Sequence, residues 1–298
     1  MAAPNFLLIG AAKSGTTSIY KYLQQHPQIF LPPKPEQRFF LMEGKHGPFT
    51  RPGNINAGRQ IVTNWPAYQA VFQGVTSETA IGEGSNDYLW GPGAAGRIYE
   101  YLPTIKLIAI LRHPVERAYS EYWMRRRDRG FESLTFTKAI QAEMSELEQP
   151  WQLWSRYYLR GGFYYRHLTP FLNLFERDQL KIYLFDDLKQ QPLAIIKDMY
   201  RFLGVEPDFQ PNLAVWQNRG GQPQPERLYW LLSEWQRRMP STGSIRHPFM
   251  LMERLKRRCL INPPSIPPAL REMMLAHYRV ETLNLQLVLQ RDLSHWLS

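Results

Sequence analysis

Cysteine is almost absent from this 298-residue sequence, in which Cys259 is the only one. A single thiol cannot form a disulfide within the chain or a metal site built from several cysteines, so we expect Cys259 to be structural. Long apolar runs are also missing, and no stretch is long enough to span a bilayer. The short run from Phe6 to Gly10 has no basic region before it, as a signal peptide would have. These absences predict a soluble, cytoplasmic protein without a transmembrane segment.

Acidic residues are in the minority, with 26 Asp and Glu against 36 Lys and Arg and a formal net charge of +10. A basic chain favours an anionic partner such as a nucleotide, a polyanionic glycan, a nucleic acid or a negative membrane surface, although a basic surface also serves solubility. No zinc-finger, helix-turn-helix or RNA-binding signature is present, so we expect no nucleic-acid partner.

The order of apolar runs predicts an α/β fold. Short runs rich in branched residues are typical of buried parallel strands, and longer amphipathic patterns between them predict helices. The alternation indicates a mainly parallel central sheet flanked by helices in one domain spanning residues 1–298. The predicted strands are Asn5 to Gly10, Thr79 to Gly84, Ile105 to Leu111 and Leu180 to Phe185. The predicted helices are Thr16 to His26, Gly93 to Leu102, Pro114 to Arg127, Leu134 to Leu147, Gly162 to Glu176, Pro192 to Leu203, Glu226 to Arg238 and Ala269 to Leu275.

Two stretches have no clear period. Phe40 to Gly74 reads as a long functional loop, with aromatic residues that can anchor it, namely Trp65, Tyr68 and Phe72. Met239 to Pro268 mixes prolines with cations and predicts either a solvated basic face or a contact with an anionic ligand. Those cations are Arg246, Arg254, Lys256, Arg257 and Arg258, accompanied by His247 and the single acid Glu253.

A candidate anion site follows the first strand. The loop from Gly10 through Lys13 to Ser18 runs directly into an amphipathic pattern, and exposed backbone N–H groups at a helix start attract phosphate. Helix capping by Thr16 to Ser18 is the alternative. The spacing of Gly10 and Gly15 matches a nucleoside-triphosphate P-loop, but Thr16 and Thr17 occupy the positions of its lysine and hydroxyl. The lysine lies earlier, at position 13, which suits a shorter donor group without a metal ion.

A second candidate anion ligand is Arg112, which ends an apolar strand just before the helix that Pro114 opens. Its planar guanidinium can donate two parallel hydrogen bonds to a phosphate, while an ion pair at the helix entry is the alternative. Ser120 follows eight residues later.

Both segments resemble the PAPS-dependent sulfotransferase family, in which PAPS is 3′-phosphoadenosine 5′-phosphosulfate. Residues Lys13-Ser14-Gly15-Thr16-Thr17-Ser18 match its 5′-phosphosulfate loop, and Arg112 with Ser120 match its 3′-phosphate motif. Glu83 to Leu89, Leu180 to Leu188 with Phe202 to Gly204, and Tyr278 to Trp296 extend the similarity, which favours the bacterial and heparan-sulfate-type branch. The resemblance implies a P-loop-like three-layer fold, PAPS as co-substrate, 3′,5′-ADP as product and no required metal.

Sulfonyl transfer is an in-line displacement that requires stabilisation of the leaving oxygen and removal of the acceptor proton. Lys13 can stabilise the charge. Glu36 is the candidate base, because burial near Phe39 and Phe40 can raise the pKa of a carboxyl group. A glutamate three residues before a Phe-Phe pair also resembles the heparan-type branch, although Pro35 stands where lysine usually precedes the glutamate, which leaves the role of Lys34 open. A solvated glutamate is the alternative.

Three further residues are weaker candidates for the base: His26, His113 and Glu83. His26 precedes Pro27 at a helix end, where capping is expected, and His113 lies in the 3′-phosphate turn. Other clusters also allow two interpretations. The cations from Arg125 to Arg129 either complement a helix end or bind an anionic acceptor. An aromatic group forms either core or a sugar-stacking or lipid-binding pocket; it comprises Trp151, Trp154, Tyr157, Tyr158, Phe163, Tyr164 and Tyr165.

The sequence therefore predicts a sulfotransferase that moves a sulfonyl group from PAPS to a hydroxyl or amine acceptor, with a carbohydrate or other anionic molecule as the expected acceptor. A P-loop nucleotide kinase and a non-catalytic polyanion-binding protein are the alternatives. The oligomeric state is not predicted.

Overall fold

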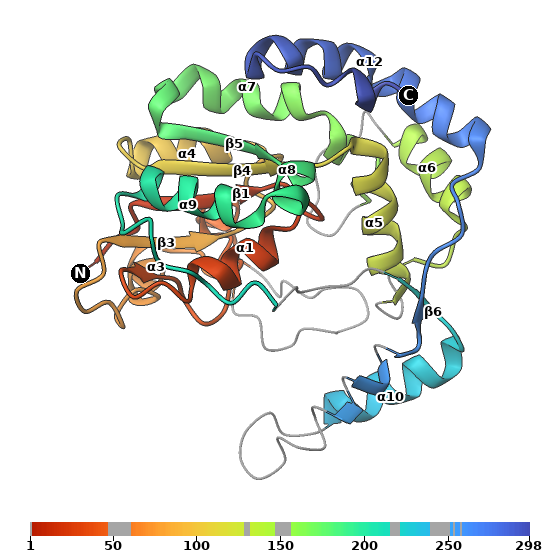
Figure 1. Ribbon diagram of the computed structural model, residues 1–298, viewed down its shortest axis with the longest axis horizontal. Helices are drawn as coiled ribbons and strands as arrows, with labels where there is room; N and C mark the ends of the chain where they lie inside the picture. The colour runs from red at the N-terminus through yellow and green to blue at the C-terminus, as the bar shows by residue number, and fades with distance from the viewer. Residues whose placement is uncertain are drawn as a thin grey trace.

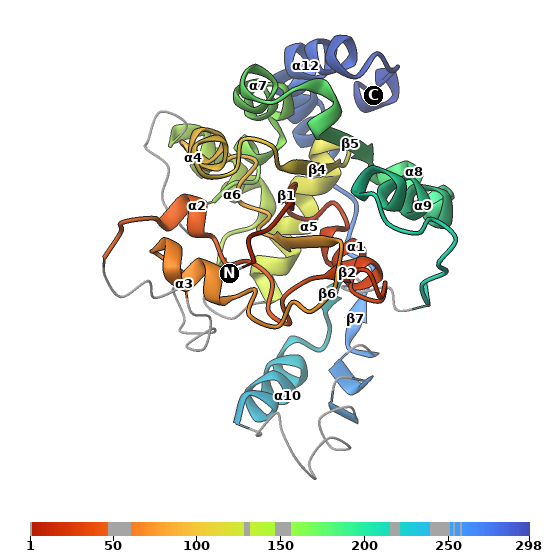
Figure 2. The same cartoon turned by 90° about the vertical axis from the view of Figure 1, so that its left-hand side faces the viewer.

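A five-stranded sheet lies at the centre of the protein, as the computed structural model shows in Figures 1 and 2. The structure describes residues 2–46, 61–127, 132–146, 156–214, 221–238, 251–252, 254–256 and 258–298. Neighbouring strands are all parallel, so their carboxyl ends meet at one edge of the sheet. The strand order is β2 (Ile29–Phe30), β3 (Ala80–Gly84), β1 (Phe6–Gly10), β4 (Lys106–Leu111) and β5 (Leu180–Leu184).

The two faces of the sheet are buried against separate sets of helices. Successive side chains of a strand point to opposite faces. In β1, Leu7 and Ile9 therefore join one core cluster, whereas Phe6 and Leu8 join another. The first cluster is covered by α2 (Phe39–Met42), α3 (Trp65–Ala70), α4 (Ala94–Tyr101) and α7 (Tyr164–Leu174), and the second by α1 (Thr16–Leu23), α8 (Phe185–Gln190) and α9 (Pro192–Leu203).

A third cluster lies beyond the carboxyl edge of β4. It joins α5 (Pro114–Arg127), α6 (Phe136–Ser145) and α12 (Pro268–Leu289) around Tyr158 and Tyr278. The short 3-10 turns are Arg160–Gly162, Arg177–Gln179 and Ser294–Trp296. A separate two-stranded antiparallel sheet pairs β6 (Gln222–Pro223) with β7 (Leu260–Ile261), and α10 (Glu226–Arg238) extends away from the main body beside it (Figure 1).

The predicted fold class is confirmed, since the protein is a three-layer α/β structure with a parallel central sheet. Each predicted strand and helix coincides with an observed element. The predicted last helix, Ala269 to Leu275, was too short, because α12 continues to Leu289. Its outward residues Val280, Leu283 and Leu287 are exposed and interrupt the polar face that an amphipathic pattern needs.

The interpretation of Phe40 to Gly74 as one irregular loop was wrong in two places, because the stretch begins within α2 and contains α3. Residues 47–60 of this stretch lie outside the described residues. Its aromatic anchors are confirmed: Tyr68 and Phe72 are buried, and Tyr68 stacks on Phe39 with ring centroids 4.8 Å apart. The antiparallel pair β6–β7 was not predicted. Within the described parts of the chain, no helix combines the length and hydropathy required to cross a membrane.

Candidate active site

Two glycines shape the loop between β1 and α1. Gly10 has a φ of 150°, and a Cβ there would lie 2.9 Å from Leu89 Cβ and 3.0 Å from the Asn86 carbonyl oxygen. Gly15 has a φ of 90°, and its Cβ would lie 3.0 Å from two ring carbons of Phe185. A side chain at either position would collide or be strained, so the close approach of this loop to its neighbours depends on glycine.

The loop leaves polar groups available at the start of α1. The N-cap residue is Gly15, so no side chain caps the helix, and the alternative role of Thr16 to Ser18 as capping residues finds no support. Ser14 is fully buried, and its hydroxyl lacks a hydrogen-bond partner of ordinary geometry. A buried orphan hydroxyl beside an uncapped helix N-terminus fits an anionic group such as a phosphate or sulfate.

Arg112 lies beside this loop at the end of β4, the strand that pairs with β1. Its Nη1 donates to the Lys13 carbonyl oxygen at 3.3 Å, and its guanidinium lies 5.0 Å from the centre of the Phe185 ring. Burial lowers the pKa of Arg112, and the negative charge of Glu116 opposes that shift. No carboxylate among the described residues forms an ion pair with Arg112, so the helix-entry ion pair considered from the sequence is not observed.

The loop and Arg112 therefore meet at the point where the strand order reverses. The chain places β2 and β3 on one side of β1, and β4 and β5 on the other. Open parallel sheets bind ligands outside the carboxyl ends of their strands at such a point. Ser120, the other predicted phosphate ligand, lies half-buried on α5.

Glu36 lies on the other side of β1, at the end of β3. Its backbone N–H donates to the Gly84 carbonyl oxygen at 2.8 Å. Its Oε2 lies 2.7 Å from Arg38 Nη2, and the Asn86 side chain donates to its Oε1 at 3.4 Å. The side chain is 20% exposed, so the carboxylate can reach a bound molecule.

Arg38 is a partner of Glu36 that the sequence interpretation missed. It also pairs with Asp87, whose Oδ2 lies 2.7 Å from Arg38 Nε. Burial opposes the cation, but Asp87 and then Glu36 raise the pKa of Arg38. Phe39 and Phe40, expected to surround the glutamate, are packed in the core. The sequence did contain an indication of this pair, because an arginine follows the glutamate by two residues.

The three weaker candidates for the base have other roles in the structure. His26 accepts from the Gln28 N–H at 3.1 Å and contacts the Glu206 carbonyl at 2.9 Å, so its side chain joins two loops and does not cap α1, whose C-cap is Gln24. Burial lowers the pKa of His113 to about 4, which leaves it a weak base. Burial raises the pKa of Glu83 to about 7, although its carboxylate accepts hydrogen bonds. Glu83 is fully buried, so an acceptor cannot touch it directly.

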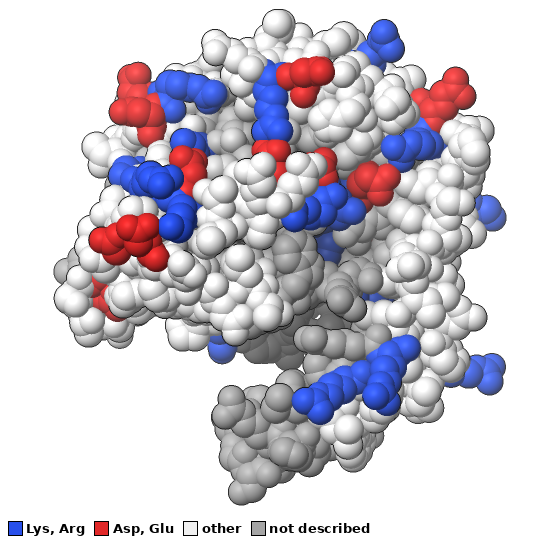
Figure 3. All heavy atoms as spheres, in the orientation of Figure 1, with Lys and Arg blue, Asp and Glu red and all other residues white. Residues whose placement is uncertain are grey.

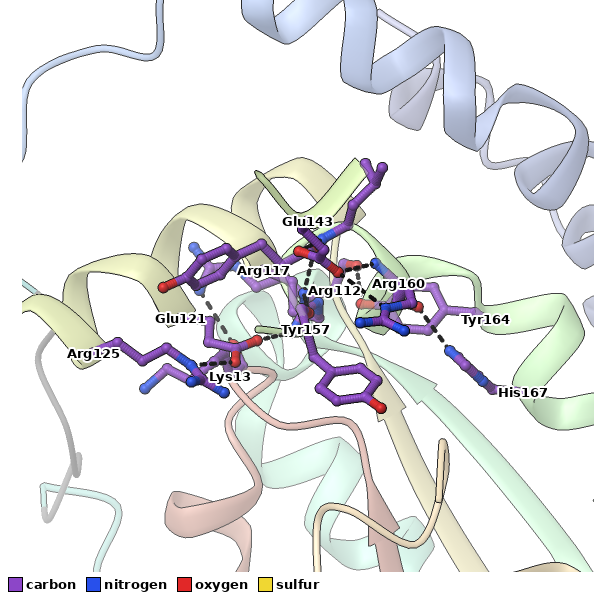
Figure 4. A network of polar contacts seen from close by, with 12 residues as sticks. Lys13, Arg112, Arg117, Glu121, Arg125, Glu143, Tyr157, Arg160, Tyr164 and His167 are labelled. Carbon is purple, nitrogen blue, oxygen red and sulfur yellow. Dashed lines mark hydrogen bonds and ion pairs between the residues drawn. The ribbon is translucent and has the colours of Figure 1, made fainter. Parts of the chain in front are cut away.

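The arginines of α5 form a buried ion-pair network near the loop (Figure 4). Arg117 Nη1 lies 2.8 Å from Glu121 Oε2, and Arg125 Nε lies 2.9 Å from Glu121 Oε1. Arg126 contacts the carbonyl oxygens of residues 132 and 133. These contacts support a structural role for residues 125 and 126, while 128 and 129 lie outside the described residues.

The aromatic group is mainly core. Four of its members are buried, and two lie outside the described residues. The buried ones are Tyr157, Tyr158, Phe163 and Tyr164, and the others are Trp151 and Trp154. In the basic stretch, Arg254 and Arg258 are exposed and Lys256 lies 5.5 Å from the Tyr229 ring centre, while Arg246, His247, Glu253 and Arg257 are not among the described residues.

Known proteins are similar to this chain over most of its length. A membrane-associated sulfotransferase of Dictyostelium discoideum is 33% identical over 156 residues, which are 50% of this chain and 30% of that protein. The bifunctional heparan sulfate N-deacetylase/N-sulfotransferase 3 of Mus musculus is 29% identical, covering 71% of this chain and 23% of its own length. The chain therefore spans less than a third of the length of these curated relatives.

A solved structure and a family model match larger parts of this chain. The crystal structure of a sulfotransferase from Alicyclobacillus acidocaldarius is 31% identical with a TM-score of 0.76, and the match covers 100% of both chains. The model described as "Sulfotransferase family" matches residues 4–211. That range includes β1 with its anion loop, Glu36, and Arg112 with Ser120. The similarity predicted from these motifs is confirmed, and the chain belongs to the sulfotransferase family.

Proposed function

We propose that the protein transfers a sulfonyl group from PAPS to a hydroxyl or amine group of a carbohydrate acceptor. The observation that carries this proposal is Arg112, a half-buried cation at the carboxyl edge of the sheet without a carboxylate partner among the described residues. It lies beside the Lys13 carbonyl and the uncapped start of α1. Desolvated cations need a counter-charge, and a bound anion supplies it.

The two halves of the site suit the two ends of PAPS. In our proposal, Lys13 to Ser18 hold the 5′-phosphosulfate, with the orphan hydroxyl of Ser14 as one donor. Arg112 and Ser120 hold the 3′-phosphate. When bound, PAPS supplies the sulfonyl group, and 3′,5′-ADP is the product that leaves.

The chain itself contributes charge stabilisation and proton transfer. Lys13 stabilises negative charge on the leaving oxygen, as a fixed cation does in a low-dielectric site. Glu36 accepts the proton of the acceptor group through its partly exposed carboxylate. We propose no metal ion in this reaction.

An anionic glycan is the acceptor class that we propose. The mouse relative is named for heparan sulfate, and the net charge of +10 favours a polyanion. Figure 3 shows Lys and Arg mixed with Asp and Glu over the upper body, and further Lys and Arg side chains on the lower part of this face. A cytoplasmic location and a single domain over residues 1–298 remain predictions of the sequence.

One assay tests this proposal against a nucleotide kinase and a non-catalytic polyanion binder. The purified protein is incubated with PAPS or ATP and a panel of acceptors, including N-desulfated heparin, with and without a chelator. Products are followed by mass spectrometry. We expect 3′,5′-ADP and a sulfated acceptor in the presence of the chelator. Consumption of ATP only with Mg²⁺, with no reaction of PAPS, would overturn the proposal in favour of a kinase, and binding of heparin without turnover of either nucleotide would favour the polyanion binder.

A further inference from the structure

Arg38 is a buried cation beside Glu36 that is paired with two carboxylates. Its side chain is 5% exposed, and its guanidinium pairs with two carboxylates at 2.7 Å each. Nε faces Asp87, which follows β3, while Nη2 faces Glu36. A planar guanidinium presents its donors in a fixed fork, so fixing one edge on Asp87 also fixes the direction of the other.

The backbone around this pair is in an uncommon conformation. Glu36 and Arg38 have φ values of 67° and 57°, in the left-handed region. Residues with a Cβ lose about 1–2 kcal/mol there, so contacts elsewhere must hold the loop. The Arg38 N–H donates to Ser85 Oγ at 3.0 Å, and the Ser85 hydroxyl donates to the buried carboxylate of Glu83 at 2.9 Å.

The end of β3 and the residues that follow it therefore hold the loop that carries Glu36 in place. Gly84 fixes the backbone of Glu36, Ser85 fixes the backbone of Arg38, and Asp87 fixes the Arg38 side chain. These contacts place one Glu36 oxygen on Arg38 at 2.7 Å and the other 3.4 Å from the Asn86 side chain.

We propose that Arg38, anchored by Asp87, is a positioning residue that aims the Glu36 carboxylate at the acceptor. This inference rests on the proposed function, because it assumes that Glu36 is the base. Arg38 does not touch the reacting atoms. It keeps the Glu36 carboxylate oriented, and Asp87 balances the charge of Arg38, so that no net positive charge is added beside the base.

The test compares Arg38→Met and Asp87→Asn with Lys181→Met. The control removes a cation paired with Asp198 at 3.1 Å, at the amino end of β5 and so at the opposite edge of the sheet. With the best acceptor of the panel, we expect Arg38→Met to lower kcat by about 100-fold, as small displacements of a catalytic group do. Asp87→Asn, which retains the pair with Glu36, should lower it less. The affinity for 3′,5′-ADP, measured by calorimetry, should not change.

A double-mutant cycle separates positioning from general damage to the fold. If Arg38 acts through Glu36, Arg38→Met should cause almost no further loss in a Glu36→Gln background, because coupled residues are not additive. Arg38→Lys should recover part of kcat, since one ammonium can replace one of the two contacts. An additive loss, or normal kcat in Arg38→Met, would overturn the inference.

A crystal structure of Arg38→Met provides a readout that needs no acceptor. We expect the Glu36 carboxylate to leave its place beside Asn86 while β3 is unchanged, and an unmoved Glu36 would overturn the inference. The two proposals fail differently. If the wild type sulfates no acceptor of the panel, the proposed function is wrong, whereas a strong Glu36→Gln effect with a normal Arg38→Met enzyme contradicts only the positioning role.

Discussion

Arg112 and Arg117 belong to the same β4–α5 unit but have opposite surroundings. Arg117 is fully buried and its charge is paired inside the protein: it pairs with Glu121 at 2.8 Å, donates to the Tyr157 carbonyl at 2.6 Å and lies over the Trp90 ring. Arg112 contacts a carbonyl and a ring, with no carboxylate partner among the residues described. The difference indicates that an arginine paired with a carboxylate of its own chain supports the fold. An arginine without a carboxylate partner at a sheet edge is suited to bind an anionic ligand.

Replacing the internally paired arginine should have the largest effect. We expect Arg117→Met to lower the free energy of unfolding by about 3 kcal/mol or more, because it leaves buried carbonyls and part of Glu121 without a partner. Urea unfolding measures this change. Arg112→Met should be close to wild type in the same experiment, and equal losses in both variants would break the comparison.

The lysine of the anion loop should matter for rate rather than stability. We expect Lys13→Ala to lower kcat by about 100- to 1000-fold, the usual effect of losing one group that stabilises transition-state charge. Steady-state kinetics with PAPS measure it, and thermal unfolding serves as the control. A variant that retains at least half of the wild-type kcat would exclude Lys13 from the chemistry.

Glu83 is an acidic residue in the same situation as Arg112, since no residue of opposite charge pairs with it among the described residues. Burial raises its pKa from the usual 4.5 to about 7. Between these values the unfolded chain loses the proton while the folded protein keeps it, so stability should fall as pH rises, by at most roughly 3 kcal/mol. Unfolding of wild type and Glu83→Gln from pH 4 to 8 tests this, because the variant should lack that decline. A parallel pH dependence of the two proteins would contradict it.

Replacing Arg112 should have a smaller effect, which is specific to nucleotides with a 3′-phosphate. Hydrogen bonds to a charged group contribute about 1.5–3 kcal/mol, so Arg112→Met should weaken binding of 3′,5′-ADP by about 10- to 100-fold. Binding of 5′-AMP, which lacks the 3′-phosphate, should barely change, and calorimetry with both nucleotides separates the two cases. A uniform loss for both ligands would show that Arg112 does not select the 3′-phosphate.

Two residues of the proposed donor half, Lys13 and Arg112, lie shortly after strands that short apolar runs predicted, and parallel strands bring those ends together. Ser120 lies further along, on α5. Lys13 and Arg112 are 99 residues apart and still form a hydrogen bond. The positions of Gly10 and Gly15 also indicated the tight turn that the structure contains.

Of the proposed acceptor half, the sequence predicted only Glu36. Arg38 and Asp87 are 49 residues apart, and neither lies in a periodic element that would bring them together. Short helices such as α2 (four residues) and α8 (six residues) are too brief to establish a pattern. The β6–β7 pair contains a proline, which argues against a strand in any sequence-based prediction.

The position of β1 between β3 and β4 has a consequence for how the enzyme can diversify. The residues assigned to the nucleotide are attached to β1 and β4, while the proposed base and its support are attached to the chain around β3. Substitutions of side chains around β3 can therefore reshape the proposed acceptor side while the residues assigned to the nucleotide on β1 and β4 are kept. A common donor with many acceptors is the chemistry that such a division of one sheet edge allows.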